Sequence, residues 1–373
     1  MENTSKLETV LKELKNKEAN FYFFTLDTKG NPTAGVANIY EHVKVLTELG
    51  YNAHILHEKD DYRLSGDEDG MGIKEWLGAE LSHVSIESQE LQVKPSDFMI
   101  IPEIFASIMD QVKDMPCKKI VFVQSPEYMF EVLPIGKRWT IDYGFNDVIT
   151  TSERVSEHVK SHFPDANTHI VPVSIPEYFK NSDKPKKPIV TLVARNQSDV
   201  IKITKSFYLQ YPLYKWITFK ELRGISRKQF AQELGESCLA IWVDDLSGFG
   251  TFPIEAMECK TPVIGKMPNI LPEWMEVKDE DGNPMVKDNG IWTNTTNNIP
   301  ELIGRYLKLY LEDSEPSEIL ENMEKTTGVY TSDAQRDKLE VVYSNLMSNR
   351  IAEIEALMDK TNELQEIKTE TNE

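Results

Sequence analysis

The sequence predicts an α/β protein in which two Rossmann-like domains face each other across a cleft, followed by a long C-terminal helical segment. A chain of 373 residues has the length of two domains of about 100–200 residues each. Short apolar runs alternate with amphipathic segments in two successive series, as parallel strands joined by helices do. The predicted boundaries are a first domain over 1–175, a linker over 176–188, a second domain over 189–325, and a C-terminal helix with an acidic tail over 326–373 that returns toward the first domain.

The first series predicts an open sheet in the first domain. Leu7, Leu11 and Leu14 recur at helical spacing, Gly50 stands just past a second helical segment, and Ser152 has the position of an N-cap. The run FYFFTL is continuously apolar, as a strand must be when helices cover both faces of its sheet. The expected elements are helices over 1–20 and 35–49, and strands over 21–26, 51–56, 97–101, 119–124, 147–150 and 169–173.

The second series begins after the linker over 176–188, which combines prolines with a charged run. Its strands are expected at 189–194, 215–219, 239–243, 262–264 and 290–292, with helices between them and another over 299–311. Two Rossmann-like domains in this order predict a ligand in the crevice at the carboxyl ends of their strands.

The C-terminal segment is predicted to form one or two long helices. Apolar residues such as Leu339, Val342 and Leu346 recur there at three-to-four spacing. The last 23 residues carry seven acids and two lysines, so the end is expected to be solvated. Self-association through this helix is a second interpretation, although Arg350 and Thr361 interrupt the apolar seam.

The charge of the chain bears on its partners and its location. A net charge of −20 repels polyanions unless basic residues gather in one cleft. No apolar run reaches the roughly 18 residues that span a bilayer, and the N-terminus lacks the apolar core of a signal peptide. The sequence therefore predicts a cytoplasmic protein without stable membrane insertion.

The sequence also predicts no metal centre and no disulfide. Cys117, Cys238 and Cys259 are few, scattered and adjacent to apolar runs, so buried free thiols are expected. No Cys and His residues have the spacing of a zinc site. The acidic, glycine-containing stretch over 58–72 is interpreted as a surface loop, with a metal site as the alternative.

The most informative segment covers residues 239–264. A buried strand ends in Asp244 and Asp245, Gly248 and Gly250 turn the chain, and a helix over 252–259 follows. Glycines let backbone amides approach a ligand closely, and the N-terminus of a helix offers unpaired N–H donors and a positive dipole end. The segment predicts a phosphate site, while an ordinary turn before a helix remains the alternative interpretation.

This segment resembles the signature of GT-B glycosyltransferases of the large retaining family 4, in which a loop E-G-F-G precedes a helix E-A-M-A-C-G-T-P-V. Here the loop is Ser247-Gly248-Phe249-Gly250, and the helix contains Glu255-Ala256-Met257-Glu258-Cys259-Lys260-Thr261-Pro262-Val263. Similar segments follow the order of that family over roughly residues 20 to 310: Ala34-Gly35-Val36, Thr151-Ser152-Glu153, Val193-Ala194-Arg195 and Pro272-Glu273.

The resemblance implies roles for individual residues. Arg195 matches the arginine that neutralises the donor diphosphate, and Lys202 or Lys205 is the candidate for the lysine that accompanies it. Glu255 matches the glutamate that holds the nucleotide ribose, and Gly35 the glycine whose amide approaches the diphosphate or the sugar. The loop formed by Ser247, Gly248, Phe249, Gly250 and Thr251 would hold the same ligand.

Two positions depart from the family pattern. The family usually has a second glutamate eight positions before the one matched by Glu255, and this chain has Ser247 there. Asp244 or Asp245 is the alternative carboxylate for the sugar. The family also commonly places a histidine where this chain continues Ser125-Pro126-Glu127. We therefore assign no catalytic histidine.

The function that the resemblance implies is transfer of a hexosyl or pentosyl group from a nucleotide sugar, most simply UDP-linked, with retention of configuration and without a metal or other cofactor. The acceptor is open between a small molecule, a polysaccharide and a modified DNA base. One alternative is a binding or scaffold protein that has lost transfer chemistry, which Ser247 favours because it replaces the expected glutamate. The other is a sugar-nucleotide epimerase of the same architecture.

Overall fold

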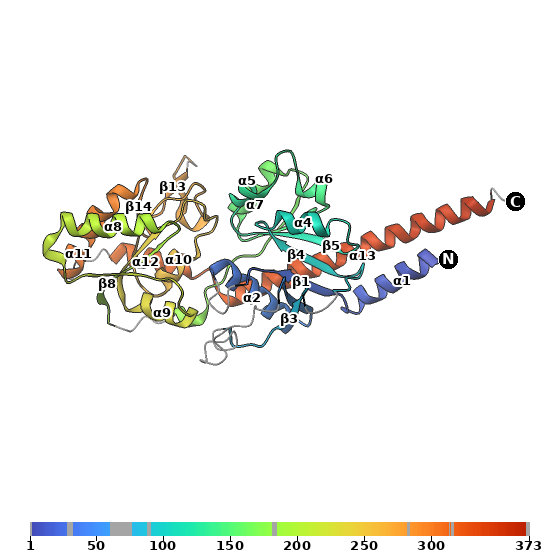
Figure 1. Cartoon of the computed structure of the whole chain (residues 1–373), viewed down its shortest axis with the longest axis horizontal. Coiled ribbons are helices and arrows are strands. Elements are labelled where there is room, and N and C mark those ends of the chain that lie inside the picture. The colour runs from blue at the N-terminus through green and yellow to red at the C-terminus, as the bar shows by residue number, and fades with distance from the viewer. Residues whose placement is uncertain are drawn as a thin grey trace.

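The computed structural model describes residues 2–27, 33–59, 77–87, 91–180, 185–281, 284–312, 314 and 317–370. In this part of the chain, two parallel sheets lie side by side, each between layers of helices (Figure 1). We call residues 2–170 with 332–370 the first lobe, and residues 187–327 the second lobe.

The first lobe is built on a seven-stranded sheet of described strands in the order β3-β2-β1-β4-β5-β6-β7. All neighbouring strands in it are parallel. Its elements are α1 (Glu2–Lys15), β1 (Asn20–Phe24), α2 (Ala34–Glu48), β2 (Asn52–His57), β3 (Ser82–Ser85), β4 (Phe98–Pro102), α4 (Ala106–Val112), β5 (Lys118–Val123), α5 (Tyr128–Val132), α6 (Trp139–Tyr143), β6 (Asp147–Thr150), α7 (Glu153–His162) and β7 (Asn167–Ile170).

The second lobe is built on a five-stranded parallel sheet in the order β14-β11-β10-β8-β9. A short antiparallel pair, β12 with β13, lies apart from it. Its elements are β8 (Lys187–Ala194), α8 (Gln197–Gln210), η3 (Pro212–Tyr214), β9 (Thr218–Glu221), α9 (Arg227–Glu236), β10 (Ser237–Val243), α10 (Thr251–Glu258), β11 (Val263–Lys266), η4 (Glu273–Met275), β12 (Glu276–Lys278), β13 (Pro284–Val286), β14 (Ile291–Thr293), η5 (Thr296–Asn298), α11 (Ile299–Leu311) and α12 (Ser317–Thr327), and η2 (Glu177–Phe179) precedes it.

Four apolar clusters fill the space between these layers. In the first lobe, α1, α2 and α13 (Ser332–Glu370) cover one face of the sheet, and α4, α6 and α7 cover the other. In the second lobe, α9, α10 and α12 cover one face, and α8 and α11 the other. Because both faces of each sheet are buried, the central strands are continuous apolar runs, as the sequence pattern indicates.

The long helix α13 leaves the second lobe and packs against α1 and α2 of the first. Leu339, Tyr343, Leu346 and Ile354 of α13 are buried in the same cluster as Val10 and Leu14 of α1. Figure 1 shows the last turns of α13 running out beyond the first lobe, near the N-terminal helix. The apolar seam expected in this helix is therefore largely occupied by its own chain.

The contacts between the lobes include two polar contacts and one glycine contact beside the cleft. Arg154 on α7 donates to both carboxylate oxygens of Glu276, each at 2.6 Å, and the backbone N–H of Glu153 donates to Glu273 at 3.0 Å. A Cβ on Gly248 would lie 2.5 Å from Cδ of Pro126. Glycine at position 248 is therefore explained by contact between the lobes.

The described structure confirms most of the expected elements. The strand expected at 147–150 is β6 and the helix at 299–311 is α11, and Ser152 caps α7 through a bond from the N–H of Val155. All three cysteines are free and buried, as expected. The other expected strands are displaced by one to three residues, and residues 60–72 and 181–184 lie outside the described part.

Three strands were not expected, and one was misplaced. β3, β12 and β13 have only three or four residues each. β3 and β12 are mostly polar, and β13 is too short for its apolar residues to indicate a strand. The strand expected at 215–219 begins only at Thr218, because η3 continues the chain as a turn up to Tyr214 and the N–H of Ile217 bonds to its carbonyl.

Packing of α13 predicts a large difference between two leucines on the same helix. Leu346 is 1% exposed and Leu357 is 48% exposed. Leu346→Ala should lower the free energy of unfolding by about 3 kcal/mol, because it leaves a cavity in the core. Leu357→Ala is the matched control and should change it by less than about 0.5 kcal/mol. Urea unfolding of both variants measures the difference, and equal effects would show that α13 is not part of this core.

Candidate active site

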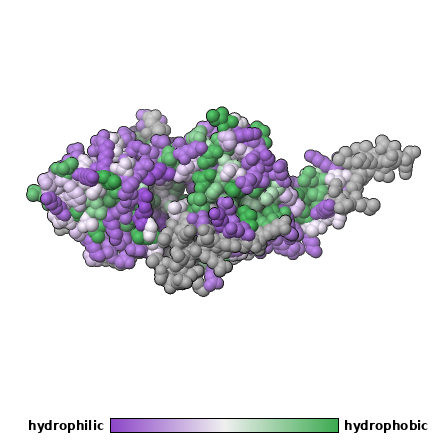
Figure 2. All heavy atoms as spheres, viewed as in Figure 1, coloured by the Kyte–Doolittle hydropathy of each residue, from purple (hydrophilic) through white to green (hydrophobic). Residues whose placement is uncertain are grey.

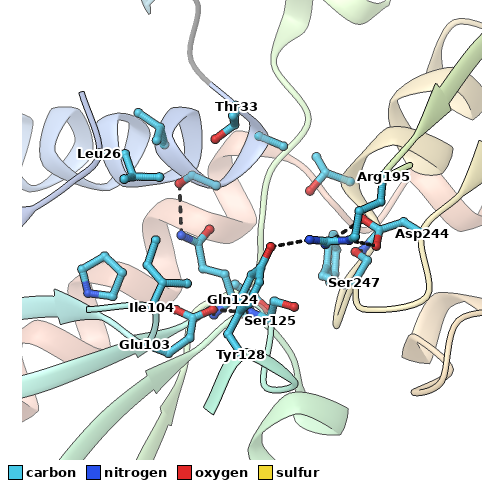
Figure 3. A pocket seen from close by; sticks show the side chains of 18 of the residues that line it. Leu26, Thr33, Glu103, Ile104, Gln124, Ser125, Tyr128, Arg195, Asp244 and Ser247 are labelled. Atoms are coloured by element: carbon cyan, nitrogen blue, oxygen red, sulfur yellow. Dashed lines mark hydrogen bonds and ion pairs between the residues drawn. The ribbon is translucent and has the colours of Figure 1, made fainter. Parts of the chain in front are cut away.

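A cavity of about 740 Å³ lies between the two lobes. Its wall comes from the segments that follow β1, β4, β5 and β6 in the first lobe, and β8, β9 and β10 in the second. In both sheets the carboxyl ends of the parallel strands therefore open onto it, which is where open α/β sheets bind ligands. Figure 3 shows Glu103, Gln124 and Tyr128 facing Arg195, Asp244 and Ser247 across this space.

The loop before α10 forms part of the wall. Ser247, Phe249, Gly250 and Thr251 line the cavity. The Ser247 hydroxyl accepts a hydrogen bond of 2.8 Å from the N–H of Gly250, and no side chain caps the N-terminus of α10. The first N–H groups of a helix lack partners within the helix, so the start of α10 can bind a negatively charged ligand.

Gly250 has two structural reasons to be glycine. Its φ of +73° lies in the left-handed region, and a Cβ there would lie 3.0 Å from the ring of Trp242 and 3.2 Å from that of Trp274. Gly248, the other glycine of the loop, does not line the cavity. The structure thus brings four of the five loop residues expected at a ligand to the cavity wall, and places Gly248 between the lobes.

Arg195 follows β8 and lies in the wall of the cavity. Its Nε and Nη2 donate to the two carboxylate oxygens of Asp244 at 2.8 and 3.2 Å. Its Nη1 donates to the hydroxyl of Tyr128 at 2.5 Å, across from the first lobe. Burial disfavours the charge of this guanidinium, but the bonds to Asp244 and Tyr128 outweigh burial and raise its pKa further. Arg195 is therefore a fixed cation at the cavity.

Gly35 brings the start of a second helix to the cavity. It lies in the first turn of α2, whose N-terminus has no side-chain cap, and it lines the cavity with Thr33 and Ala34. The Gln124 side chain donates to the Gly35 carbonyl at 3.1 Å, and a Cβ on Gly35 would lie 3.3 Å from that amide nitrogen. Glycine at this position therefore keeps α2 close to the end of β5.

Besides Gly248, three of the expected site residues do not line the cavity. Lys202 and Lys205 are exposed on α8, on the side away from its buried residues Val200 and Ile203. Glu255 is 1% exposed, and its carboxylate forms an ion pair with Arg227 of α9. Position 255 is one turn inside α10, where α9 packs over it.

A second arginine, Arg223, lies in the cavity wall instead of the two lysines. It follows β9, and its Nε lies 3.0 Å from a carboxylate oxygen of Glu221. Its position at the end of a strand adjacent to β8 explains why it lies near Arg195. Sequence reasoning missed it, because the preceding strand was expected to end at 219 and the resemblance that assigned Arg195 matched no residue near 223.

Glu103 is a buried carboxyl in the first-lobe wall that sequence reasoning also missed. It follows β4 directly and is 2% exposed. Its Oε1 accepts hydrogen bonds from the N–H groups of Ser125 at 2.6 Å and Gln124 at 3.1 Å. Burial raises the pKa of Glu103 to about 7, and the two backbone donors offset part of that rise.

Two absences within the described residues bear on cofactors and membranes. In the described ranges, no three His, Cys, Asp or Glu side chains gather closely enough to hold a metal ion. None of the described helices combines the length and apolar character needed to cross a bilayer.

The geometry of Gly250 predicts a graded effect of alanine substitutions. Gly250→Ala should lower the free energy of unfolding by about 1–2 kcal/mol for the left-handed backbone and by about 1–3 kcal/mol more for overpacking against the two tryptophans. Gly136→Ala separates the two effects, because Gly136 has a φ of +79° and open space around its Cβ position. Denaturant unfolding should show the larger loss for Gly250→Ala.

Glu103 predicts a pH dependence of stability with a definite sign. Its pKa is about 7 in the folded chain and about 4.3 in an unfolded one. Between these values the folded state binds one proton more, so the stability that Glu103 contributes falls as pH rises from about 4 to 8, by about 3 kcal/mol.

Glu103→Gln removes this titration. The free energy of unfolding of the variant minus that of the wild type should therefore increase over this pH range, as measured by urea unfolding at several pH values. A difference that does not change with pH would contradict the assigned environment of Glu103.

Comparison with known proteins adds to this geometry. No protein-family model matches the chain. In sequence the chain is similar to an α-1,6-glucosyltransferase of Actinobacillus pleuropneumoniae serotype 7 (strain AP76), with 24% identity over 254 residues that cover 67% of this chain and 73% of that protein.

Solved structures show the same arrangement of lobes. The chain is similar to a sucrose-phosphate synthase from Thermosynechococcus elongatus, with a TM-score of 0.56 and 11% identity over 89% of this chain and 100% of the other. It is also similar to Anabaena HepE in complex with UDP and glucose, with a TM-score of 0.58 and 12% identity over 87% of this chain and 99% of the other. The expected fold class is thereby confirmed: the chain has the two-lobed GT-B architecture.

Proposed function

We propose that the protein is a glycosyltransferase that moves a hexosyl group from a UDP-linked sugar to an acceptor hydroxyl. One observation carries the proposal: the Arg195 guanidinium and the uncapped N-termini of α10 and α2 line one cavity between the lobes. The name of the similar Actinobacillus protein, a glucosyltransferase, and the UDP and glucose in HepE support this choice of reaction and donor.

The second lobe would hold the nucleotide and its diphosphate. Arg195 keeps guanidinium hydrogens that are not used by Asp244 or Tyr128, because a guanidinium has five N–H donors. The backbone of Gly250 and Thr251 would add donors at the start of α10. Arg223 is the second cation within the described wall, a role that the resemblance had given to Lys202 or Lys205.

The reaction would proceed in the cavity as follows. The bond between the anomeric carbon and the diphosphate oxygen breaks, a bond from the acceptor oxygen to that carbon forms, and the acceptor proton passes to the departing diphosphate. The charge that develops on the diphosphate is stabilised by Arg195 and the helix amides, which are fixed before the reaction. Attack on the face that the diphosphate leaves would retain the configuration, and closure of the lobes would exclude water.

Glu255 would act indirectly. Its carboxylate is bound to Arg227, so we assign it to holding α10 and α9 together beneath the loop over residues 247–250. Contact between Glu255 and the ribose would require the ion pair with Arg227 to open, which is costly for a buried charge.

Substitution of Arg195 tests the proposal. The wild type should gain thermal stability on addition of UDP or a UDP-sugar, since a ligand of the native state stabilises it by mass action. Arg195→Ala should lower the affinity for UDP by about 10-fold to 100-fold, because one charge-assisted hydrogen bond contributes about 1.5–3 kcal/mol. Arg305→Ala, which removes an exposed arginine of α11, should bind UDP as the wild type does.

A double variant identifies the cause of that loss. Arg195→Ala leaves the carboxylate of Asp244 without its partner, and that negative charge could itself repel UDP. In Arg195→Ala/Asp244→Ala the repulsion is absent. If the charge of Arg195 is needed for binding, the double variant should still bind UDP weakly. Thermal shifts measure UDP binding, and turnover of UDP-glucose measures activity, in both variants. Wild-type affinity and turnover in Arg195→Ala would overturn the proposal.

A binding protein without transfer activity is the second candidate. Ser247 favours it, because this residue stands where the resembling family has a glutamate and its hydroxyl is used within the loop. UDP-sugar binding without product, across neutral and charged acceptors, would support that candidate.

A further inference from the structure

The first-lobe wall of the cavity is apolar and carries negative groups. Its titratable side chains are Tyr128 and the carboxyls Glu103 and Glu131, and within the described residues no lysine or arginine of this lobe lines it. Apolar residues make up much of the remainder: Leu26, Val36, Ile39, Pro102, Ile104, Phe105 and Val132. The opposite wall contains Arg195 and Arg223. The two walls thus suit ligands of different charge.

Hydrophobic residues reach the surface beside this wall. In the view of Figure 2, green residues run along the edge of the first lobe next to the hollow between the lobes, and purple residues predominate on the facing edge of the second lobe. The apolar character of the first-lobe wall and the hydrophilic character of the second-lobe wall therefore continue onto the surface beside the cavity.

Glu103 offers one free oxygen to the cavity. Oε1 is held by the two backbone N–H groups of Gln124 and Ser125. Oε2 accepts no hydrogen bond from another described residue and takes part in no ion pair of the described residues. The residue as a whole is 2% exposed. Figure 3 shows the Glu103 side chain beside Ile104 at the edge of the cavity. Oε2 is not one of the described side-chain atoms that are both sealed from solvent and unpartnered, and it belongs to a residue that lines the cavity, so a ligand or water there can donate a hydrogen bond to it.

We propose that the first-lobe wall binds an uncharged acceptor through a hydroxyl group bonded to Oε2 of Glu103, and that it excludes anionic acceptors such as sugar phosphates and DNA. This inference rests on the proposed function and names the acceptor class for the same cavity. The apolar residues of the wall pack against the C–H face of a sugar ring or a comparable neutral body.

A hydroxyl group suits the Glu103 carboxyl better than a phosphate group does. It can donate to Oε2 when the carboxyl is ionised and accept from it when the carboxyl is protonated, whereas the oxygens of a fully ionised phosphate can only accept. A phosphate would also bring a negative charge close to Glu103 and Glu131 without a basic side chain in the described wall. Like charges repel strongly where water is scarce.

Glu103→Gln isolates the free oxygen. The glutamine oxygen can still accept from Ser125 and Gln124, and its NH₂ group replaces Oε2, so that an acceptor becomes a donor. With UDP-glucose as donor, we expect kcat/KM for the best neutral acceptor in a panel of methyl glucosides and disaccharides to fall about 10-fold to 100-fold, mainly through KM. The thermal shift induced by UDP should stay unchanged. Glu157→Gln, on the exposed surface of α7, is the control.

A charge reversal tests the exclusion of anions without altering a buried group. Glu131 is exposed at the cavity, and Glu157 is exposed outside it. Glu131→Lys should raise transfer to glucose 6-phosphate relative to methyl glucoside several-fold. The substitution replaces a negative charge at the cavity by a positive one, which attracts the phosphate. Glu157→Lys should leave that ratio unchanged.

The outcomes separate this inference from the proposed function. Equal transfer by the wild type and Glu103→Gln at limiting acceptor would overturn it. So would a wild-type preference for glucose 6-phosphate, or for an oligonucleotide containing 5-hydroxymethylcytosine, over the neutral panel. If instead the wild type gives neither a thermal shift with UDP nor any turnover of UDP-glucose, the proposed function itself is wrong and this inference falls with it.

Discussion

The arrangement of the cavity wall depends on the contacts that balance the charge of Arg195. In the structure this guanidinium is bound on one side by Asp244 of its own lobe and on the other by Tyr128 of the opposite lobe. Asp244 fixes its direction, since a bidentate pair allows little rotation. The bond to Tyr128 spans the cleft, as does the bond from the Ser125 hydroxyl to the Leu246 carbonyl. An anion that binds Arg195 would therefore act directly on a contact between the lobes, and binding of the proposed donor would be coupled to the relative position of the lobes.

Much of the fold follows from the sequence because the sheets are buried on both faces. β1, β4, β5 and β10 are continuous apolar runs, and such runs need no long-range information to be identified. β3 could not be found in this way, because it lies at the edge of its sheet and contains His83 and two serines. Its strand conformation comes from pairing with β2, which is a tertiary contact that local pattern does not reveal.

The site was predictable where it lies at strand ends and unpredictable where it depends on packing between distant segments. Arg195 and the loop before α10 directly follow strands, and the parallel arrangement brings them together. Glu255 is different, because its environment is set by Arg227, which lies 28 positions away in the sequence. The spacing within α10 indicates which turn holds Glu255, but it does not indicate that α9 covers that turn. Glu103 likewise gains its buried character from the segment after β5.

Recognition in this cavity has to work against the charge of the whole molecule. The chain carries a net charge of −20, and both arginines of the described wall already have carboxylate partners. The proposed nucleotide diphosphate would therefore not be attracted by the net charge, and its binding would depend on short-range donors whose directions are fixed in advance. Salt screens the long-range repulsion more than these partly buried contacts. The described part of the first-lobe wall has no cation to offset the same field, so the uncharged acceptor proposed above would avoid a cost that an anionic one would meet both on approach and in the cavity.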